Sequence, residues 1–289
     1  MELLVTGAFS GAKLHMRDLE EKGHRVHFLQ FEKDELPCPP DQIEGVICNG
    51  LFLYHAIENF TSLRFIQLTS AGYDRVPMEY VREHGIEIHN ARGVYSIPMA
   101  EFAVACVLEH YKKLAVFRDQ QTRHEWRKNR DLMELAGKRV VIVGCGDVGT
   151  ECAKRFRAFD CEVVGVNRTV RDSVYFDRIV GLSMLDEELN RADTVVVSIA
   201  LCKDTEGLVK ARLLEPESLL VNISRGGIVD LTGARCTLVL DVFEEEPISE
   251  ESPLWDMENV VIIPHNSFVG DGNSDRLFRL IMSNLEKAQ

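Results

Sequence analysis

The apolar residues of this chain gather in short runs, and the segments between the runs have the spacing of helices. In the first third, β-branched and aliphatic runs predict strands at 2–6, 25–29, 45–48, 63–68 and 86–88. Amphipathic spacing predicts a helix at 13–22, which ends before Gly23, and Pro77 suits the first turn of another helix. Strands that alternate with helices form parallel, doubly wound sheets, so we expect an α/β domain here.

A second α/β pattern fills the rest of the chain. Runs rich in Val, Ile and Leu, typical of strands covered on both faces, occur at 139–143, 162–166, 178–180, 194–199, 219–223, 237–243 and 260–263. Helical spacing follows Thr150 and recurs at 182–191 and 275–288. A long apolar helix predicted over Ser96–Phe117 connects the two patterns, and its excess apolar surface suggests a subunit contact.

The length of the chain favours two domains. A chain of 289 residues is long for a single hydrophobic core. We predict a first domain at 1–95, a second domain at 96–267, and a final helical segment at 268–289 that returns to the first domain.

One connection in the second pattern is unusually short. Only Gly226–Cys236 separate two of its predicted parallel strands, whereas a crossover that contains a helix needs about a dozen residues or more. The stretch Val209–Pro216 is also slightly short for a helix. Either these crossovers are loops, or residues are missing from the sequence. The segment IVDLTGARC has no helical spacing with which to cover the sheet, and this favours missing residues.

Charge and cysteine content argue against several functions. The net charge is −13, with 33 Lys and Arg against 46 Asp and Glu, which disfavours nucleic acid or an anionic membrane as a partner. The eight cysteines form no Cys-x-x-Cys pair, so we expect free thiols, a cytoplasmic location and no metal site. The first residues, MELLVTGAFS, lack the pattern of a signal peptide, and no apolar run is long enough to span a membrane.

The stretch RVVIVGCGDVG at 139–149 is the strongest single motif. A buried-strand pattern leads into Gly144, Gly146 and Gly149 at G-x-G-x-x-G spacing, and helical spacing follows. In this context the first glycine permits a tight turn, the second lets a pyrophosphate approach the backbone, and the third lets helix and strand pack closely. The N-terminus of the helix then faces the phosphates. We therefore predict a dinucleotide site, although the spacing alone also occurs in ordinary loops.

The end of the next predicted strand bears on the choice of dinucleotide. An NAD site usually has an acidic residue there, which accepts a hydrogen bond from the ribose 2′-OH. This chain has Asn167, Arg168 and Thr169 instead, with Arg171 close behind. An arginine can hold a 2′-phosphate through two hydrogen bonds. We predict a preference for NADP(H) with NAD(H) as a possible cofactor; the alternative is that Arg168 stacks on adenine or is solvated.

Three further stretches place an Arg, a carboxylate and a His directly after predicted strands. They are Asn222–Gly227 with Arg225, Asp241–Pro247 with three Glu, and Pro264–Ser267 with His265. Ligands of parallel sheets bind beyond the carboxyl ends of the strands. An Arg can clamp a 2-keto acid, a His can protonate the oxyanion that hydride transfer creates, and a carboxylate can orient that His. Each residue alone is more simply explained as structural, but their shared position favours a hydride-transfer site.

As an ordered set, several segments resemble the D-isomer-specific 2-hydroxyacid dehydrogenases, which include phosphoglycerate, D-lactate and glyoxylate/hydroxypyruvate dehydrogenases or reductases. The segments are GVYSIPMAEFAVACVL, ELAGKRVVIVGCGDVG, NISRGGIVD, LDVFEEEP with SPLW, and NVVIIPHNS. The resemblance implies a Rossmann domain and a flavodoxin-like substrate domain with the active site in the cleft between them. It implies NAD(P)-dependent interconversion of a small 2-keto acid and its D-2-hydroxy acid, in a homodimer.

The resemblance also implies roles for single residues. Arg225 would bind the substrate carboxylate and carbonyl, and His265, paired with Glu246, would donate the proton in reduction. The substrate would also lie near Gly50, Leu51, Ala71, Gly72 and Ser267. The cofactor would contact Gly144, Gly146, Asp147, Val148, Gly149, Asn167, Arg168, Thr169, Ile199, Ala200, Thr205, Ile223, Ser224 and Asp241, the last of them near the nicotinamide carboxamide.

A second hypothesis comes from a different functional class. Related transcriptional corepressors use this fold as a dinucleotide-sensing binding module, and such relatives can keep the Arg, Glu and His. The acidic charge of this chain favours the enzyme. Substrate selectivity is then expected to depend on the pocket shape around Leu51, Phe52, Tyr73 and Trp255.

Overall fold

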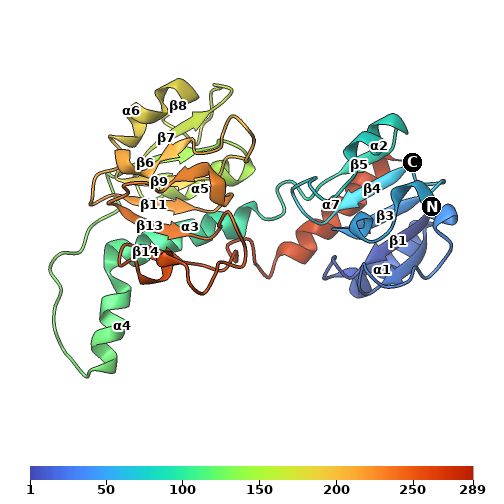
Figure 1. The fold of residues 1–289 in the computed structure, drawn as a ribbon, viewed down its shortest axis with the longest axis horizontal. Helices are drawn as coiled ribbons and strands as arrows, with labels where there is room; N and C mark the ends of the chain where they lie inside the picture. The colour runs from blue at the N-terminus through green and yellow to red at the C-terminus, as the bar shows by residue number, and fades with distance from the viewer. Residues whose placement is uncertain (289) are drawn as a thin grey trace. The chain divides into compact units, whose positions relative to one another are not determined.

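The computed structural model describes residues 1–288, and the chain forms two compact units. Unit 1 comprises Met1–Tyr95 and the C-terminal segment from Gly270, and unit 2 comprises Ser96–Val269. Figure 1 shows that each unit is a sheet flanked by helices. All strand pairs in both units are parallel, which confirms the expected α/β class.

Unit 1 contains a five-stranded sheet in the order β2-β1-β3-β4-β5, the flavodoxin-like order. Its strands are β1 (Glu2–Thr6), β2 (Arg25–Leu29), β3 (Gly45–Cys48), β4 (Phe65–Leu68) and β5 (Glu87–His89). The helices α1 (Ala12–Glu21) and α7 (Asn273–Lys287) pack on one face, and α2 (Met78–Glu83) packs on the other. Short 3₁₀ turns at Pro40–Gln42, Leu51–Leu53 and Ile57–Asn59 complete the unit.

The last helix, α7, is tied to the unit 1 sheet by apolar and polar contacts. Leu277, Ile281 and Leu285 recur every four residues, so they form one apolar face, and that face is buried. Within the same contact the buried Asn284 donates a hydrogen bond of 2.8 Å to the side chain of Gln67 in β4. A buried polar pair that satisfies itself in this way fixes the position of the helix along the strand.

Unit 2 contains a seven-stranded sheet in the order β14-β13-β11-β9-β6-β7-β8. Counted along the chain this is 3-2-1-4-5-6 with one more strand, the Rossmann order. The strands are β6 (Arg139–Val143), β7 (Glu162–Asn167), β8 (Arg178–Gly181), β9 (Thr194–Val197), β11 (Leu219–Asn222), β13 (Thr237–Leu240) and β14 (Val260–Ile262). The helices are α3 (Ser96–Lys112), α4 (Leu114–Thr122), α5 (Asp147–Arg157) and α6 (Leu185–Leu189), with 3₁₀ turns at Leu182–Met184, Ala211–Leu213, Gly226–Ile228 and Pro253–Asp256.

The helix predicted over Ser96–Phe117 is wrong in its extent. It breaks at Lys113, whose backbone is left-handed (φ 49°), and α4 continues beyond the break into the polar stretch. Much of the apolar surface of α3 is buried inside unit 2, where it packs on α5. Figure 1 shows α4 and the segment after it standing away from the rest of the unit. The exposed apolar surface therefore belongs to α4, on which the side chains of Leu114 and Val116 are exposed.

The two short crossovers of unit 2 contain no α-helix. In these crossovers β10 (Val209–Lys210) pairs in parallel with β12 (Val229–Asp230). Ile228, Val229 and Ala211 are buried there against the sheet. The argument that this face would be left uncovered is therefore wrong, because two-residue strands and 3₁₀ turns cover it in place of helices.

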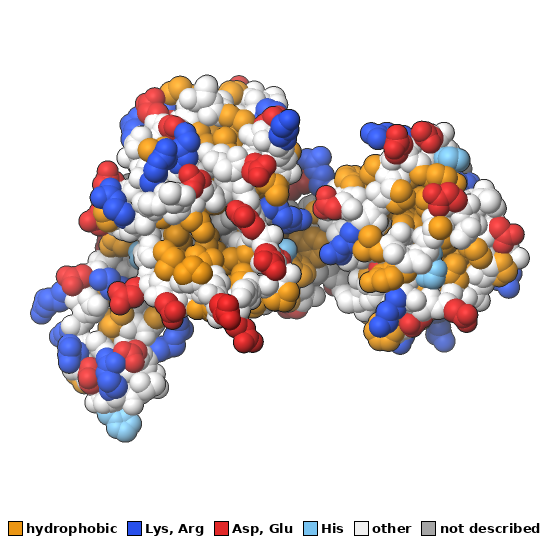
Figure 2. All heavy atoms as spheres, viewed as in Figure 1, with side chains coloured by type: hydrophobic (Ala, Val, Ile, Leu, Met, Phe, Trp, Pro, Cys, Tyr) orange, Lys and Arg blue, Asp and Glu red, His pale blue; other side chains and the backbone are white. Residues whose placement is uncertain are grey.

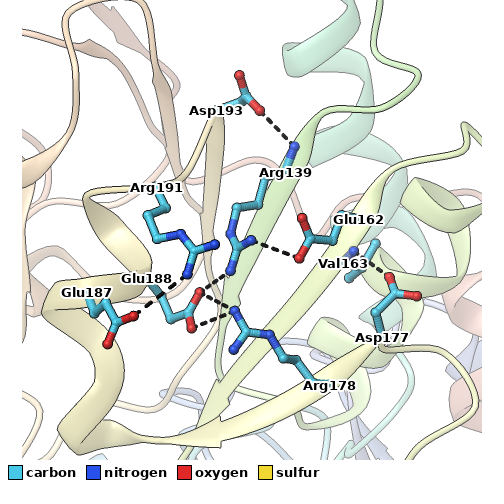
Figure 3. A network of polar contacts seen from close by, with 9 residues as sticks. All are labelled: Arg139, Glu162, Val163, Asp177, Arg178, Glu187, Glu188, Arg191 and Asp193. Atoms are coloured by element: carbon cyan, nitrogen blue, oxygen red, sulfur yellow. Dashed lines mark hydrogen bonds and ion pairs between the residues drawn. The ribbon is translucent and has the colours of Figure 1, made fainter.

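A network of charged side chains closes the edge of the unit 2 sheet at which β6, β7 and β8 begin (Figure 3). The fully buried carboxylate of Glu188 lies 2.6 Å from the guanidinium of Arg139 and 2.8 Å from that of Arg178. The Arg139 side chain also reaches Glu162 at 2.8 Å, and the Arg139 N–H donates to Asp193 at 2.8 Å. These contacts join the starts of three strands to α6.

The view in Figure 2 shows acidic and basic side chains interspersed on both units rather than separated by sign. Across residues 1–288, none of the helices is long and apolar enough to cross a membrane.

Replacing Glu188 with Ala should lower the free energy of unfolding by about 3 kcal/mol, because it leaves the mostly buried Arg139 short of a counter-charge. The neighbouring Glu187→Ala is the matched control, since Glu187 makes an exposed ion pair with Arg191 at 3.7 Å. Its effect should stay below about 1 kcal/mol. Urea denaturation of the two variants measures the difference, and equal losses would contradict the structural role of the network.

Candidate active site

The glycine turn after β6 has the geometry that its spacing predicts. Gly144 is left-handed (φ +102°), and a Cβ there would lie 2.5 Å from the backbone nitrogen of Ile199. A Cβ at Gly149 would lie 1.9 Å from the Gly144 carbonyl oxygen, so only glycine allows helix and turn to pack this closely. The helix begins at Asp147 rather than at Thr150, which puts Val148 and Gly149 inside its first turn.

The middle glycine of the turn differs from its neighbours. A Cβ at Gly146 would meet no atom within 4 Å, so no packing within the protein requires glycine there. Gly146 is also the N-cap residue of α5, whose first N–H groups have no partner within the helix. Open space above a helix N-terminus fits a bound pyrophosphate, and a side chain at Gly146 would project into that space.

The segment after β7 lies beside the glycine turn. The Asn167 side chain accepts a hydrogen bond of 3.3 Å from the Cys145 N–H and donates one of 3.0 Å to the Thr169 carbonyl. Arg171 donates to the Cys145 carbonyl at 2.8 Å and so braces the turn. Arg168 is mostly exposed at the same place, where it can reach an anion in solution.

Arg168 has two neighbours that the sequence did not predict. Its guanidinium lies 3.8 Å from the Asp204 carboxylate and 3.2 Å from the Cys202 sulfur. A hydrogen bond from Thr205 lowers the pKa of the exposed Cys202 thiol, and contacts with the Asp204 backbone and Arg168 lower it further. The predicted cofactor residue Thr205 is fully buried, with its hydroxyl donating to the Ala200 carbonyl at 2.8 Å.

The turn after β11 presents Arg225. Asn222, which is buried, accepts hydrogen bonds from the N–H and hydroxyl of Ser224 and donates one to the Arg225 carbonyl at 2.9 Å. A Cβ at Gly226 would lie 2.0 Å from the Phe243 carbonyl carbon, so this glycine lets the Arg225 turn lie directly against the loop after β13. The Arg225 side chain is exposed and donates to the Ser224 carbonyl. Ile223, between the strand and this turn, is buried in the core.

Glu246 and His265 form a hydrogen-bonded pair beside this turn. His265 Nδ1 lies 2.6 Å from a Glu246 carboxylate oxygen, and the other oxygen accepts from the Phe243 N–H at 2.9 Å. Partial burial raises the pKa of Glu246, but the hydrogen bonds from His265 and Phe243 and the Arg225 charge outweigh it and lower that pKa overall. The carboxylate therefore stays charged to a lower pH than an ordinary glutamate, and the stability that its contacts contribute is lost as the pH falls through this lowered pKa.

Asp241 holds the segment that carries His265. The buried Asp241 carboxylate accepts from the Asn266 N–H at 2.6 Å and from both the N–H and the hydroxyl of Ser267. His265 itself has a left-handed backbone (φ 47°), which is uncommon for a residue with a side chain. The hydroxyl of Ser267 thus donates a hydrogen bond to the Asp241 carboxylate. This contact helps to hold the left-handed backbone of His265 in place.

Unit 1 has two loops at the carboxyl ends of β3 and β4. The Gly50 N–H donates to the carboxylate of Glu32 at 2.7 Å. The Leu51 side chain is fully buried in the unit 1 core. In the second loop the Ala71 carbonyl accepts from Asn90 at 2.6 Å, and the Gly72 carbonyl accepts from Ser70 at 3.1 Å.

The structure brings three predicted residues of unit 2 close together. Glu246 and His265 share a hydrogen bond, and the positive charge of Arg225 helps to lower the pKa of Glu246. The contacts of Glu32, Asp204 and Cys202 could not be foreseen, because they join residues far apart in sequence that belong to no motif. Among residues 1–288 there is no group of three or more His, Cys, Asp or Glu side chains arranged to hold a metal ion.

Comparison with known proteins gives consistent matches. Residues 104–267 match the NAD binding domain of the D-isomer specific 2-hydroxyacid dehydrogenases. A glyoxylate reductase of Thermococcus gammatolerans is 30% identical over 248 residues, which are 79% of this chain and 74% of that protein. A crystal structure of a D-isomer specific 2-hydroxyacid dehydrogenase family protein from Aeromonas salmonicida superposes with a TM-score of 0.85 at 24% identity, covering 99% of this chain and 95% of that one.

A further solved structure is a D-isomer specific 2-hydroxyacid dehydrogenase from Xanthobacter autotrophicus, in complex with NADPH and MES. Its TM-score is 0.78 at 24% identity, and the alignment covers 99% of this chain and 94% of that chain. Because the domain match covers more than half of its length, the chain belongs to the D-isomer specific 2-hydroxyacid dehydrogenase family.

Proposed function

We propose that the protein reduces a small 2-keto acid to its D-2-hydroxy acid with NADPH as the preferred cofactor. The observation that carries this proposal is the 2.6 Å contact between His265 and Glu246, beside the turn of Arg225 and at the same sheet edge as the glycine turn. The glyoxylate reductase of T. gammatolerans, named for a 2-keto acid substrate, supports this substrate class.

In the proposed reaction the exposed Arg225 guanidinium binds the carboxylate and carbonyl oxygen of the keto acid. Bound NADPH supplies the hydride. His265 donates a proton to the former carbonyl oxygen, which becomes the hydroxyl of the product, while Glu246 holds the imidazole through Nδ1 and favours its charged form. Ala71 and Gly72 of unit 1 provide further contacts for the substrate carboxylate, and Asp241 and Ser267 keep the His265 turn in place.

The cofactor preference rests on Arg168. It is exposed beside the glycine turn, and no acidic residue occurs at the end of β7, where an NAD site usually has one. The exposed ion pair with Asp204 is weak, so a 2′-phosphate can displace it. The NADPH complex of the X. autotrophicus dehydrogenase is consistent with this assignment.

Replacing His265 with Gln should lower kcat by about 10²- to 10⁴-fold, because the variant keeps a similar size but cannot donate the proton as an acid. Steady-state NADPH oxidation with glyoxylate, hydroxypyruvate, pyruvate and bulkier keto acids measures this, and fluorescence titration should show unchanged NADPH binding. His84→Gln, at an exposed histidine of unit 1, should keep wild-type activity. Unchanged turnover in His265→Gln would remove His265 from the mechanism, and a wild-type protein that binds NADPH without reducing any keto acid would favour the dinucleotide-sensing module.

Replacing Arg168 with Ala should raise the KM for NADPH about tenfold or more and leave the KM for NADH within about twofold, because only NADPH carries the 2′-phosphate. Arg191→Ala removes an equal charge at the opposite edge of the sheet and should change neither value. A wild-type affinity for NADH that equals or exceeds that for NADPH would overturn the preference.

We also propose that two copies of the chain associate through α4 and the segment after it. Trp126 in that segment is 98% exposed, and a hollow of about 830 Å³ lies beside it, lined by Phe117, Gln120 and other residues of the same region. Large exposed aromatic residues next to hollows are typical of subunit contacts. The second copy of the same region is the proposed occupant.

Light scattering should give twice the mass of the chain for the wild-type protein and a larger monomer fraction for Trp126→Ser, because that variant loses an aromatic anchor. Replacing Trp255, another exposed tryptophan of unit 2, with Ser serves as the control and should leave the mass unchanged. A monomeric wild-type protein at micromolar concentration would exclude the proposed contact.

A further inference from the structure

Glu32 lies just beyond β2, and its carboxylate is held by three donors. One oxygen accepts from the Asn49 N–H at 2.6 Å and from the Thr6 hydroxyl at 2.9 Å, and the other accepts from the Gly50 N–H at 2.7 Å. These donors stand at the carboxyl ends of β1 and β3, which are neighbours in the sheet. The short N–H···O distances are those of hydrogen bonds to a charged acceptor. The carboxylate is therefore fixed at the ligand-binding edge of unit 1.

The contact with Glu32 uses the backbone N–H groups of the loop after β3, which would otherwise be free to bind a substrate carboxylate. Successive backbone N–H groups that converge on one point form an anion-binding nest, and here the anion is the Glu32 side chain. The N–H groups of Ala71 and Gly72 in the second loop, by contrast, donate to no residue in the described part of the chain. The carboxylate of a substrate would thus be bound by the second loop, while the first loop presents a negative charge.

A fixed negative charge discriminates among 2-keto acids. Every such acid carries one carboxylate beside its carbonyl, but some carry a second carboxylate or a phosphate at the far end. Glu32 is only partly exposed, so its repulsion of a second anionic group is less screened than it would be in open solvent. An uncharged substituent meets no such penalty.

The side chains that follow the strands at this edge favour the same choice. Phe31 follows β2, Leu53 and Tyr54 follow β3, and Tyr73 follows β4, and all four are exposed by 38–60%. Exposed large apolar residues on loops of one edge provide more favourable contacts for an uncharged substituent than for an anionic one.

The side chain of Arg75, a cation that would oppose this effect, approaches the same loop. The Cδ of Arg75 would lie 3.4 Å from a Cβ built on Gly50, and the Glu32 carboxylate would lie 3.5 Å from the same point. Among residues 1–288 Arg75 forms no ion pair, with Glu32 or any other residue, although its Cδ approaches this loop closely. The experiment must therefore separate the effects of Glu32 and Arg75.

We propose that Glu32 is a specificity-determining residue that restricts the substrate to 2-keto acids with a single negative charge and an uncharged substituent. This inference rests on the proposed reductase function. It adds to that function which keto acids are excluded and which side chain excludes them.

The test compares hydroxypyruvate with its phosphate ester, 3-phosphohydroxypyruvate, because the two differ only in the second anionic group. The wild-type kcat/KM for hydroxypyruvate should exceed that for the ester by about tenfold or more. In Glu32→Gln this ratio should fall at least about fivefold, since the charge is lost while the size is kept. Asp34→Asn removes an exposed charge two residues away and should leave the ratio unchanged. The ratio is informative even if Glu32→Gln loosens the loop, because loosening affects both substrates.

Two results would overturn the assignment to Glu32 alone. One is an unchanged ratio in Glu32→Gln. The other is a wild-type preference for the ester that is lost in Arg75→Gln, which would make Arg75 the selecting residue. Absence of turnover with every keto acid and with both cofactors would overturn the proposed function and this inference together, and it is distinguishable because no ratio can then be measured.

Discussion

The register of the parallel strands in unit 2 determines where every candidate catalytic residue lies. Val143, Val197, Asn222, Leu240 and Ile262 are successive partners across five strands, so these strands end in one row. The residues that follow them are the glycine turn, the loop of Thr205, the turn of Arg225, Asp241 and the His265 segment. A slip in one pairing would displace its group along the edge and separate the Glu–His pair from the Arg225 turn.

The two edges of this sheet have different tasks. At the amino edge, a buried carboxylate between two guanidinium groups joins the strands to α6, and no predicted ligand residue lies there. At the carboxyl edge, Arg225 is exposed and His265 is partly exposed, and the buried Asn222 and Asp241 hold the backbone of their turns. The charged contacts that join the strands thus lie at the amino edge. The carboxyl edge, where ligands of parallel sheets bind, has none of them.

Sequence periodicity predicted the longer strands and their parallel α/β arrangement, and the family resemblance implied both sheet types and the Glu–His pair. They failed where the sequence carries no local marker or where the structure depends on contacts between distant residues. The helix break at Lys113 has no proline or glycine to mark it, and the cover formed by β10 and β12 needs partners about 20 residues apart in sequence. The engagement of Gly50 by Glu32 follows from no motif. Sequence spacing identified the ligand loops but not which of their donors are already used.

The left-handed backbone at His265 has a consequence for how the protein tolerates change. Strain of this kind costs about 1–3 kcal/mol and persists only while the surroundings enforce it. Here the enforcing groups are the two oxygens of Asp241 and the carboxylate of Glu246. The imidazole is oriented by its hydrogen bond to Glu246, and the Asp241 contacts hold the strained backbone of the same turn, so loss of either carboxylate would let this turn relax.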